Sequence, residues 1–427
     1  MQIYIVQPGD TIYSIANAHS VSPERLSLEN DIPFPYNLVV GEALVIIQPN
    51  RTYIVQEGDT LKSISLSQQI DIMELLRNNP SISDGNLYTG EELVISYADK
   101  RTGEIETNGF TYPFIDMSIL RKTLPYLTYL TIYSYQYNRD GSLIEIEDTE
   151  IIQAAKSYGV APIMYITTPT SGDNIDTEIA HIFVSHMEIQ NRFIDTILLT
   201  LQIKGYSGIN MDTPYIQPPD RQLYVDFIKT LTNRLNREGY SVTVTVAPSL
   251  FEAATGITYS GIDYTGLSNA ANAVLYQLTY EWKYPYYLPI SILPLDAVLH
   301  TLRKAVAQFS PPKCILGFTN IGFVFEFPYF AAITEANFIN YRSAIELANN
   351  TNSKIEFNEP SHSAYFHYIG NAKEYMAWFK DSRAINSLIS NSQELGMRGI
   401  SIWNIMYFIT NIWLLINAQF EIKKILL

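Results

Sequence analysis

Three stretches of the sequence end in side chains that could do chemistry. GYSGINMDTPYI runs through apolar residues to Asp212 and on to Pro214. LTYEW carries Tyr280 and Glu281, and GISIW ends in Trp403. The carboxyl groups could donate or accept protons, and the aromatic rings could offer flat apolar surfaces with a polar edge. This chemistry requires a fold that brings the three stretches together.

The elements that would position these side chains follow residue 103. Apolar runs alternate there with amphipathic stretches such as IEDTEIIQAAKSYG, which is typical of strands and helices. Eight such units over about 320 residues predict a (β/α)8 TIM barrel of the α/β class. Three predicted strands end at our candidate sites, on the barrel face that carries chemistry in such folds. The predicted strands are Glu104–Phe110, Tyr129–Tyr135, Val160–Ile166, Ser207–Asp212, Ser241–Ala247, Val274–Tyr280, Lys313–Phe318 and Gly399–Trp403.

The longest interval between predicted strands separates the seventh from the eighth. It contains KIEFNEPSHSAYFHYIGNAKEYMAWFKD, which reads as short antiparallel strands. We therefore expect a small α+β insertion over about residues 320–385, within a barrel domain that spans 104–427.

The N-terminal part of the chain contains a tandem repeat. YIVQPGDTIYSIA begins at Tyr4 and YIVQEGDTLKSIS at Tyr53, and the offset of 49 residues persists to NLVVGEALVI and NLYTGEELVI. Such register over a whole unit indicates duplication. Each copy combines a short strand, a Gly-Asp turn, two helices and a closing strand, which predicts small β-α-α-β modules over 1–48 and 51–97.

Composition and charge narrow the classes of function. The net charge of −15 repels nucleic-acid phosphates and anionic membranes, so neither is an expected partner. No apolar run approaches the roughly 20 residues of a membrane span. MQIYIVQPGDT has no basic segment followed by an apolar one, so we expect no secretory signal and synthesis in a cytoplasm. The six His residues show no ligand spacing and no glycine-rich phosphate loop occurs, so we expect neither a metal nor a cofactor.

The repeated unit, YxVQxGDTxxSI with a closing N-L-x-x-G-x-x-L-V-I, resembles the LysM module, which binds glycans that contain N-acetylglucosamine. The resemblance implies a shallow groove between the loop after the first strand and the loop after the second helix. From the residues alone, GDT is a turn followed by a helix cap. Two weak sites on one chain would gain avidity on a polymer. The implied glycan-binding residues are Gly9, Asp10, Thr11, Ile12, Asn30 and Asp31 in the first copy, and Gly58, Asp59, Thr60, Leu61, Asn79 and Pro80 in the second.

The predicted barrel resembles glycoside hydrolase family 18 through PYLTYLTIYSYQYNRDGSL, LTYEW, AWFKDSRA and GISIWNI. Within that family, the whole chain is similar to the spore cortex-fragment-lytic N-acetylglucosaminidases of spore-forming bacteria. The fourth-strand motif of the family is D-x-x-D-x-D-x-E, and close relatives carry Asn at the second acidic position. The four positions hold Ser207, Asn210, Asp212 and Pro214 here. The outer aspartate and the general-acid glutamate are therefore both replaced.

The resemblance implies substrate-assisted hydrolysis, in which the acetamido oxygen of the sugar attacks the anomeric carbon. Asp212 would orient that acetamido group and stabilise the developing positive charge, together with a hydrogen bond from Tyr280. Proline has no proton to give to the leaving oxygen, and the loss of a general acid costs roughly 10²–10⁴-fold in rate. The implied sugar-binding residues are Asn210, Tyr280, Glu281 and Trp403, the last as the aromatic floor of the −1 subsite.

Packing offers a second interpretation of two of these residues, since Tyr280 and Trp403 could serve the barrel core instead of the sugar. Glu281 is an alternative proton donor at the predicted barrel mouth.

The sequence leaves three functions open. The first is a monomeric protein of the spore coat or cortex that binds peptidoglycan, or chitin, with lost or strongly reduced hydrolysis. The second is an active N-acetylglucosaminidase that cuts cortex fragments with an unrecognised acid. The third is a structural spore protein whose barrel binds a protein partner. Pro214 favours the first.

Overall fold

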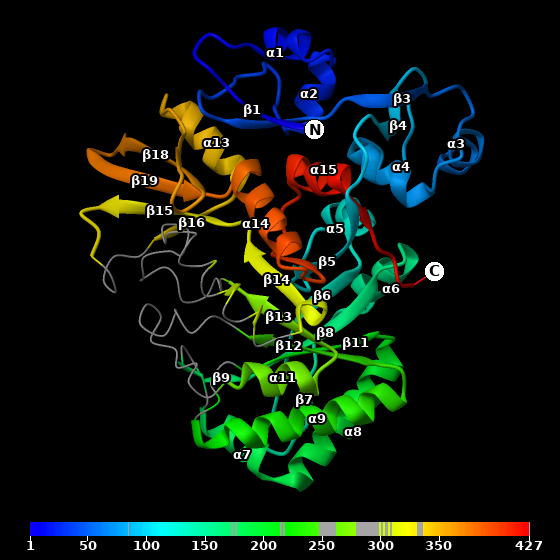
Figure 1. The fold of residues 1–427 in the computed structure, drawn as a ribbon, viewed down its shortest axis with the longest axis vertical. Coiled ribbons are helices and arrows are strands. Elements are labelled where there is room, and N and C mark those ends of the chain that lie inside the picture. Colours follow the sequence, from blue (N-terminus) through cyan, green and yellow to red (C-terminus); the bar gives the residue numbers. More distant parts are fainter. Residues whose placement is uncertain are drawn as a thin grey trace.

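The computed structural model of the 427-residue chain describes residues 1–426 except for two long segments and several short ones. The long segments are 247–261 and 279–298, and the short ones are 84, 172–173, 176, 214–215, 217, 300–301, 304–305, 308–309 and 331–335. Two small modules lie at one end of the molecule, against a large barrel (Figure 1).

The two N-terminal modules have the predicted β-α-α-β order, and in each the first and last strands pair antiparallel. Separate apolar cores fill them, with Leu26 and Leu44 central in the first and Leu75 and Leu93 in the second. The first module comprises β1 (Gln2–Ile5), α1 (Ile12–Ala18), α2 (Pro23–Glu29) and β2 (Ala43–Ile46). The second comprises β3 (Pro49–Ile54), α3 (Leu61–Gln68), α4 (Ile72–Asn78), the 3-10 turn η1 (Pro80–Ile82) and β4 (Glu92–Tyr97).

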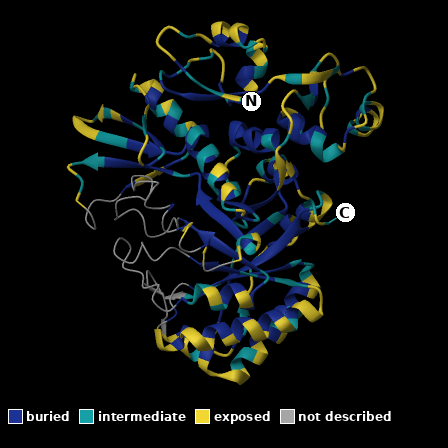
Figure 2. Cartoon of the chain, in the orientation of Figure 1, coloured by how far each residue is buried: buried dark blue, intermediate teal, exposed yellow. Residues whose placement is uncertain are grey.

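The rest of the chain forms a TIM barrel, which confirms the predicted fold class. Each strand pairs in parallel with the next, and the first also pairs with the last, so that the sheet closes. The barrel strands are β5 (Gly103–Thr111), β6 (Tyr129–Tyr137), β8 (Ala161–Thr167), β11 (Gly208–Asp212), β12 (Ser241–Val246), β13 (Ala273–Gln277), β14 (Cys314–Thr319) and β20 (Gly399–Trp403). The strands are buried on both faces, whereas the outer sides of the surrounding helices are exposed (Figure 2).

Helices with one buried face cover the barrel strands. Three of them, α5, α11 and α14, begin at an aspartate cap, as at Asp381, whose carboxylate accepts from the amides of Arg383 and Ala384. The described helices and turns are α5 (Met117–Thr123), η2 (Leu124–Tyr126), α6 (Thr149–Ser157), α7 (Thr177–Ser185), α8 (Met187–Lys204), η3 (Pro218–Asp220), α9 (Arg221–Arg237), α11 (Tyr264–Ala270), η7 (Pro311–Lys313), α14 (Ser382–Glu394) and α15 (Thr410–Gln419). The short strands are β7 (Leu143–Ile144), β9 (Thr170–Ser171), β10 (Asn174–Ile175) and β21 (Phe420–Ile422).

The segment between β14 and β20 forms the predicted α+β insertion. Its strands make an antiparallel sheet in the order β16-β15-β19-β18-β17, beside one helix. The elements are β15 (Gly322–Phe327), β16 (Asn337–Ile339), α13 (Tyr341–Asn350), β17 (Glu356–Asn358), β18 (Ser363–Gly370) and β19 (Lys373–Phe379).

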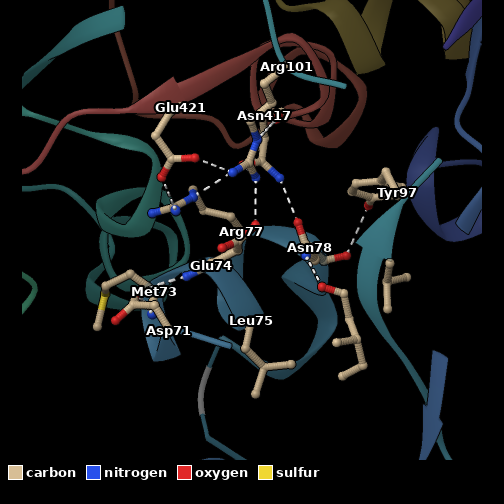
Figure 3. Close-up of polar contacts among 12 residues, drawn as sticks. Asp71, Met73, Glu74, Leu75, Arg77, Asn78, Tyr97, Arg101, Asn417 and Glu421 are labelled. Atoms are coloured by element: carbon tan, nitrogen blue, oxygen red, sulfur yellow. Dashed lines mark hydrogen bonds and ion pairs between the residues drawn. The ribbon is translucent and has the colours of Figure 1, made fainter. Parts of the chain in front are cut away.

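The second module is fixed to the barrel through the buried side chain of Arg77 (Figure 3). Its Nε donates to Asn417 Oδ1 of α15 at 3.2 Å, and Asn417 Nδ2 donates to Asn78 Oδ1 at 2.8 Å. The hydroxyl of Tyr126 donates to the carbonyl of Arg77 at 2.5 Å. Because α15 belongs to the barrel, these bonds hold the second module in one orientation against it.

The first module contacts the barrel through apolar side chains. Val39, Val45 and Ile47 belong to the same buried cluster as the barrel core. The backbone amide of Ile355, in the insertion, donates to the carbonyl of Val40 at 2.9 Å. Both modules are therefore extensions of the barrel body.

Candidate active site and glycan-binding modules

Asp212 is the last residue of β11, and its side chain is only 3% exposed. The hydroxyl of Tyr165, on the neighbouring strand β8, donates a hydrogen bond to its Oδ2. Among the described residues, Oδ1 has no hydrogen-bond partner. Burial raises the pKa of Asp212 to about 7, while the hydrogen bond from Tyr165 acts in the opposite direction. The carboxyl group can thus carry a proton near neutral pH, and it keeps one oxygen for a bound group.

Aromatic rings from three other strands gather around Tyr165. Its ring lies 5.4 Å from that of Phe110, 5.1 Å from that of Tyr133 and 6.3 Å from that of Trp403, between centroids. Trp403 in turn lies 4.5 Å from Phe110 and 5.2 Å from Tyr133. These tilted and edge-on contacts build an apolar wall beside the Asp212 carboxyl group.

Trp403 ends β20 inside the barrel, with 2% of its surface exposed. Its indole Nε1 has no hydrogen-bond partner in the described part of the chain. A buried indole N–H is normally paired, so this donor is available to a bound acceptor. The packing around Trp403 serves the barrel core as well, and its role as a sugar floor remains a prediction.

Asn210 lies two residues before Asp212, so both side chains point into the bore. Its Oδ1 accepts from the hydroxyl of Thr245 at 2.8 Å. Together with Asn108 and Thr131 it lines a cavity of about 160 Å³, toward the N-terminal ends of the strands. The structure thus places Asn210 in a polar layer beneath Asp212.

Three residues of the predicted site, Pro214, Tyr280 and Glu281, lie outside the described residues. Their roles stay predictions from the sequence. Sequence reasoning missed Tyr165, although it precedes the end of the third predicted strand by a single residue. Tyr165 is paired with Asn210 across the parallel strands, so both side chains face the bore. The sequence could not show this, because the register of the two strands was not known from it.

The Gly-Asp-Thr triplets adopt the same conformation in both modules. Asp10 accepts from the amide of Gln7 at 2.7 Å and from the hydroxyl of Tyr4 at 2.8 Å. Thr11 caps α1, and Ser14 completes a capping box. The second module repeats these bonds with Asp59, Tyr53, Gln56, Thr60 and Ser63. The turn is exposed at Gly9 and Gly58, whereas Ile12 is buried and Leu61 is half-buried.

Asn30 and Asn79 fasten the second helix of each module to its closing strand. Asn30 Nδ2 donates to the carbonyls of Leu26 and Val45, and its Oδ1 accepts from the amide of Val45. Asn79 makes the equivalent three bonds with Leu75 and Val94. Both amides are thus satisfied inside their modules, a structural role that the sequence reading did not assign.

Asp31 and Pro80 face a cleft of about 390 Å³ between the two modules and the barrel. Asp31 also accepts from the amide and hydroxyl of Thr410, at 2.7 and 2.6 Å, and so caps the start of α15. The cleft walls include Arg25 and Glu29 of α2, Lys122 of α5 and Arg342 of α13. The loops after α2 and α4 therefore open onto one shared space.

No group of three or more His, Cys, Asp or Glu side chains in the described ranges could hold a metal ion. Within the same ranges, no helix combines the length and apolar character needed to cross a membrane.

Comparison with known proteins identifies both parts of the chain. The model of the LysM domain matches residues 4–46 and 53–96, and that of glycosyl hydrolases family 18 matches residues 170–407. The chain belongs to glycosyl hydrolase family 18. This family 18 protein is 35% identical to a cortical fragment-lytic enzyme of Bacillus subtilis (strain 168) over 431 residues, which cover 99% of each chain.

Solved structures extend the similarity. The spore cortex-lytic enzyme SleL of Bacillus cereus is 29% identical, with a TM-score of 0.81 over 99% of this chain and 98% of that one. A chitinase of Chromobacterium violaceum is 16% identical, with a TM-score of 0.65 over 74% of this chain and 98% of that one, and shares the fold alone. The SleL match covers modules and barrel together, so the whole architecture is that of the cortex-lytic relatives.

Proposed function

We propose that this family 18 protein binds the N-acetylglucosamine-containing glycan of spore cortex peptidoglycan, and that it hydrolyses that glycan slowly or not at all. Its relatives named as cortical fragment-lytic or spore cortex-lytic enzymes support the choice of glycan and the association with the spore. Its two LysM modules support binding to the polymer.

The proposed loss of hydrolysis rests on a single observation. Pro214 occupies the position at which the family motif places its general acid, two residues after Asp212. A proline side chain has no ionisable proton, so the leaving oxygen would depart as a basic alkoxide. The replacement of the outer aspartate by Ser207 removes a second acidic group from the same strand.

The rest of the site supports continued sugar binding. Asp212 keeps an oxygen available beside Tyr165, and Trp403 keeps an available indole N–H. Both groups lie in a buried, largely aromatic environment, where a hydrogen bond to a sugar acetamido group gains strength from the low local dielectric. A site that only binds the sugar would need the Asp212 oxygen and the Trp403 indole N–H, but would not need a general acid.

An active N-acetylglucosaminidase is the second candidate. The intact pair of Asp212 and Tyr165 favours it, because substrate-assisted hydrolysis depends on that carboxyl group. Such an enzyme would need another proton donor, and Glu281 is the sequence's candidate.

Release of reducing ends from cortex fragments distinguishes the two functions. We expect no release above background by the wild-type protein, and weak release from nitrophenyl glycosides, whose leaving group needs little protonation. Pro214→Glu, alone or with Ser207→Asp, should restore turnover on natural fragments, and adding Asp212→Asn should abolish it again. Robust wild-type turnover that Glu281→Gln removes would establish the second candidate instead.

A further inference from the structure

Three aromatic side chains form a contiguous exposed group on the first module. Phe34 is 82% exposed and Tyr13 is 59% exposed, while Tyr36 is half-buried between them. The Tyr36 ring lies 5.5 Å from that of Phe34 and 6.2 Å from that of Tyr13, and both contacts are edge-on. Single exposed apolar residues are ordinary, but a touching group of large rings indicates a binding surface.

The group joins two segments that are distant in the sequence. Tyr13 lies on α1, directly after the Gly-Asp-Thr-Ile stretch, whereas Phe34 and Tyr36 belong to the loop after α2. The contact between Tyr13 and Tyr36 therefore links the two loops between which the LysM resemblance places a glycan.

The second module lacks this group although its fold is the same. At the offset of 49 residues, Tyr13 corresponds to Lys62, Phe34 to Ser83 and Tyr36 to Gly85. Both copies keep one backbone hydrogen bond here, since the amide of Tyr36 bonds to the carbonyl of Pro33 and the amide of Gly85 to that of Ile82. The fold of the module therefore does not require the three rings.

Tyr36 keeps its ring at a conformational cost. Its φ is +64°, in the left-handed region, and Gly85 has a φ of +81° at the equivalent position. Glycine adopts this conformation freely, whereas a residue with a Cβ atom pays roughly 1–2 kcal/mol. The ring packs partly against the core of the first module and partly against Tyr13 and Phe34, and these contacts account for its retention.

We propose that Tyr13, Phe34 and Tyr36 form a stacking platform for the pyranose rings of an N-acetylhexosamine chain, and that the first module is the principal glycan-binding module. The proposal rests on the proposed glycan-binding function and adds the residues that carry it. The axial C–H groups of a pyranose form an apolar face that matches an aromatic ring, and the tyrosine hydroxyls can bond to sugar hydroxyl or acetamido groups. The platform consists of uncharged side chains, which suits a neutral sugar.

The two modules differ at a further equivalent position, where only the second contacts the barrel. Its Arg77 is buried in that contact, whereas the equivalent Leu28 of the first module faces solvent. Both copies contact the barrel, but only the first carries aromatic side chains at these three positions.

The test transplants residues of the second module into the first. The triple variant Tyr13→Lys, Phe34→Ser, Tyr36→Gly is made in the full-length protein, on an Asp212→Asn background that protects the polymer from cleavage. Co-sedimentation with purified insoluble peptidoglycan measures affinity. We expect a loss of about tenfold or more, because these rings would supply most of the contact energy. The control pair Lys62→Ala, Ser83→Ala should change affinity by less than about twofold.

Tyr36→Gly alone separates binding from structure. It should weaken binding with little change in the thermal midpoint, because relief of the strained backbone offsets the lost contact of the ring with the module core. Tyr13→Phe and Phe34→Tyr should keep binding near the parent value. A triple variant that binds as the parent does, or a Tyr36→Gly variant with a lower midpoint and unchanged affinity, would overturn the platform alone. A parent protein that stays in the supernatant would overturn the proposed function as well.

Discussion

Arg77 and Leu28 occupy the same position in the two copies of the repeat, yet Arg77 is buried against the barrel and Leu28 is 62% exposed. The guanidinium group reaches Asn417 and the carbonyl of Pro125, both of which belong to the barrel. Equivalent positions in a duplicated unit thus have different roles, because one copy meets the barrel at this point and the other does not.

Arg77→Ala should destabilise the protein by about 2–4 kcal/mol, because it leaves buried acceptors on Asn417 and Pro125 without a donor. Urea unfolding of the full-length protein measures the loss. Leu28→Ala is the matched control and should change stability by less than about 0.5 kcal/mol. Equal effects of the two substitutions would contradict the docking role of Arg77.

Asp31→Gly should weaken attachment of the first module by about 1 kcal/mol relative to Asp31→Asn. Both substitutes tolerate the φ of +55° at this position, but only Asn keeps an oxygen that can accept from Thr410. Comparison of the two variants therefore isolates the cap at the start of α15. Hydrogen exchange of the first amides of α15 provides the local readout, and identical exchange in both variants would argue against the cap.

The free energy of unfolding of Asp212→Asn relative to that of the wild type should be higher at pH 8 than at pH 5, by at least about 1 kcal/mol. Burial raises the pKa of Asp212 to about 7, so the folded state favours the protonated form. The stability that this carboxyl group contributes is therefore complete at low pH and is lost as pH rises through about 7. Asparagine stays neutral and can still accept from Tyr165. The buried Glu29 and Glu42 also have a pKa raised to about 7, but their effect cancels between the two proteins.

Trp403→Ala should cost about 3–5 kcal/mol, because it leaves a cavity among four aromatic rings. Trp403→Phe keeps most of the packing and loses only the indole N–H. If Trp403 binds sugar, the Phe variant should lower affinity for an N-acetylglucosamine oligomer, by calorimetry, with a loss of stability below about 1.5 kcal/mol. Unchanged affinity would assign Trp403 to the barrel core alone.

The sequence predicted the barrel because its signals are local. Alternation of apolar runs with amphipathic helices marked each strand, and the prediction for β20 agrees with the structure at both ends. The two modules could also be predicted, since the duplicated sequence repeats the same turn and cap residues in both copies. The order of the elements placed Asp212 at a strand end, whereas its role in catalysis was implied by the resemblance to the family motif.

The docking of the modules could not be predicted in this way. Arg77 and Asn417 are 340 residues apart, and neither has a local pattern that marks it as a contact. The resemblance marked Asn30 as a glycan contact. Its bonds to the closing strand could not be seen in the sequence, because they depend on how the module packs. Burial of Trp403 likewise depends on rings from three other strands.

The place of α15 between the modules and the barrel has a consequence for the order of folding. Ribosomes make the chain from the N-terminus, so both modules are complete long before residues 410–419 exist. During most of synthesis the modules therefore lack their contacts with α15. Each has its own apolar core, around Leu26 and Leu75, that can stabilise it in the meantime. Earlier segments such as η2 also contact the modules, but the docking of the modules is complete only when α15 packs against both of them.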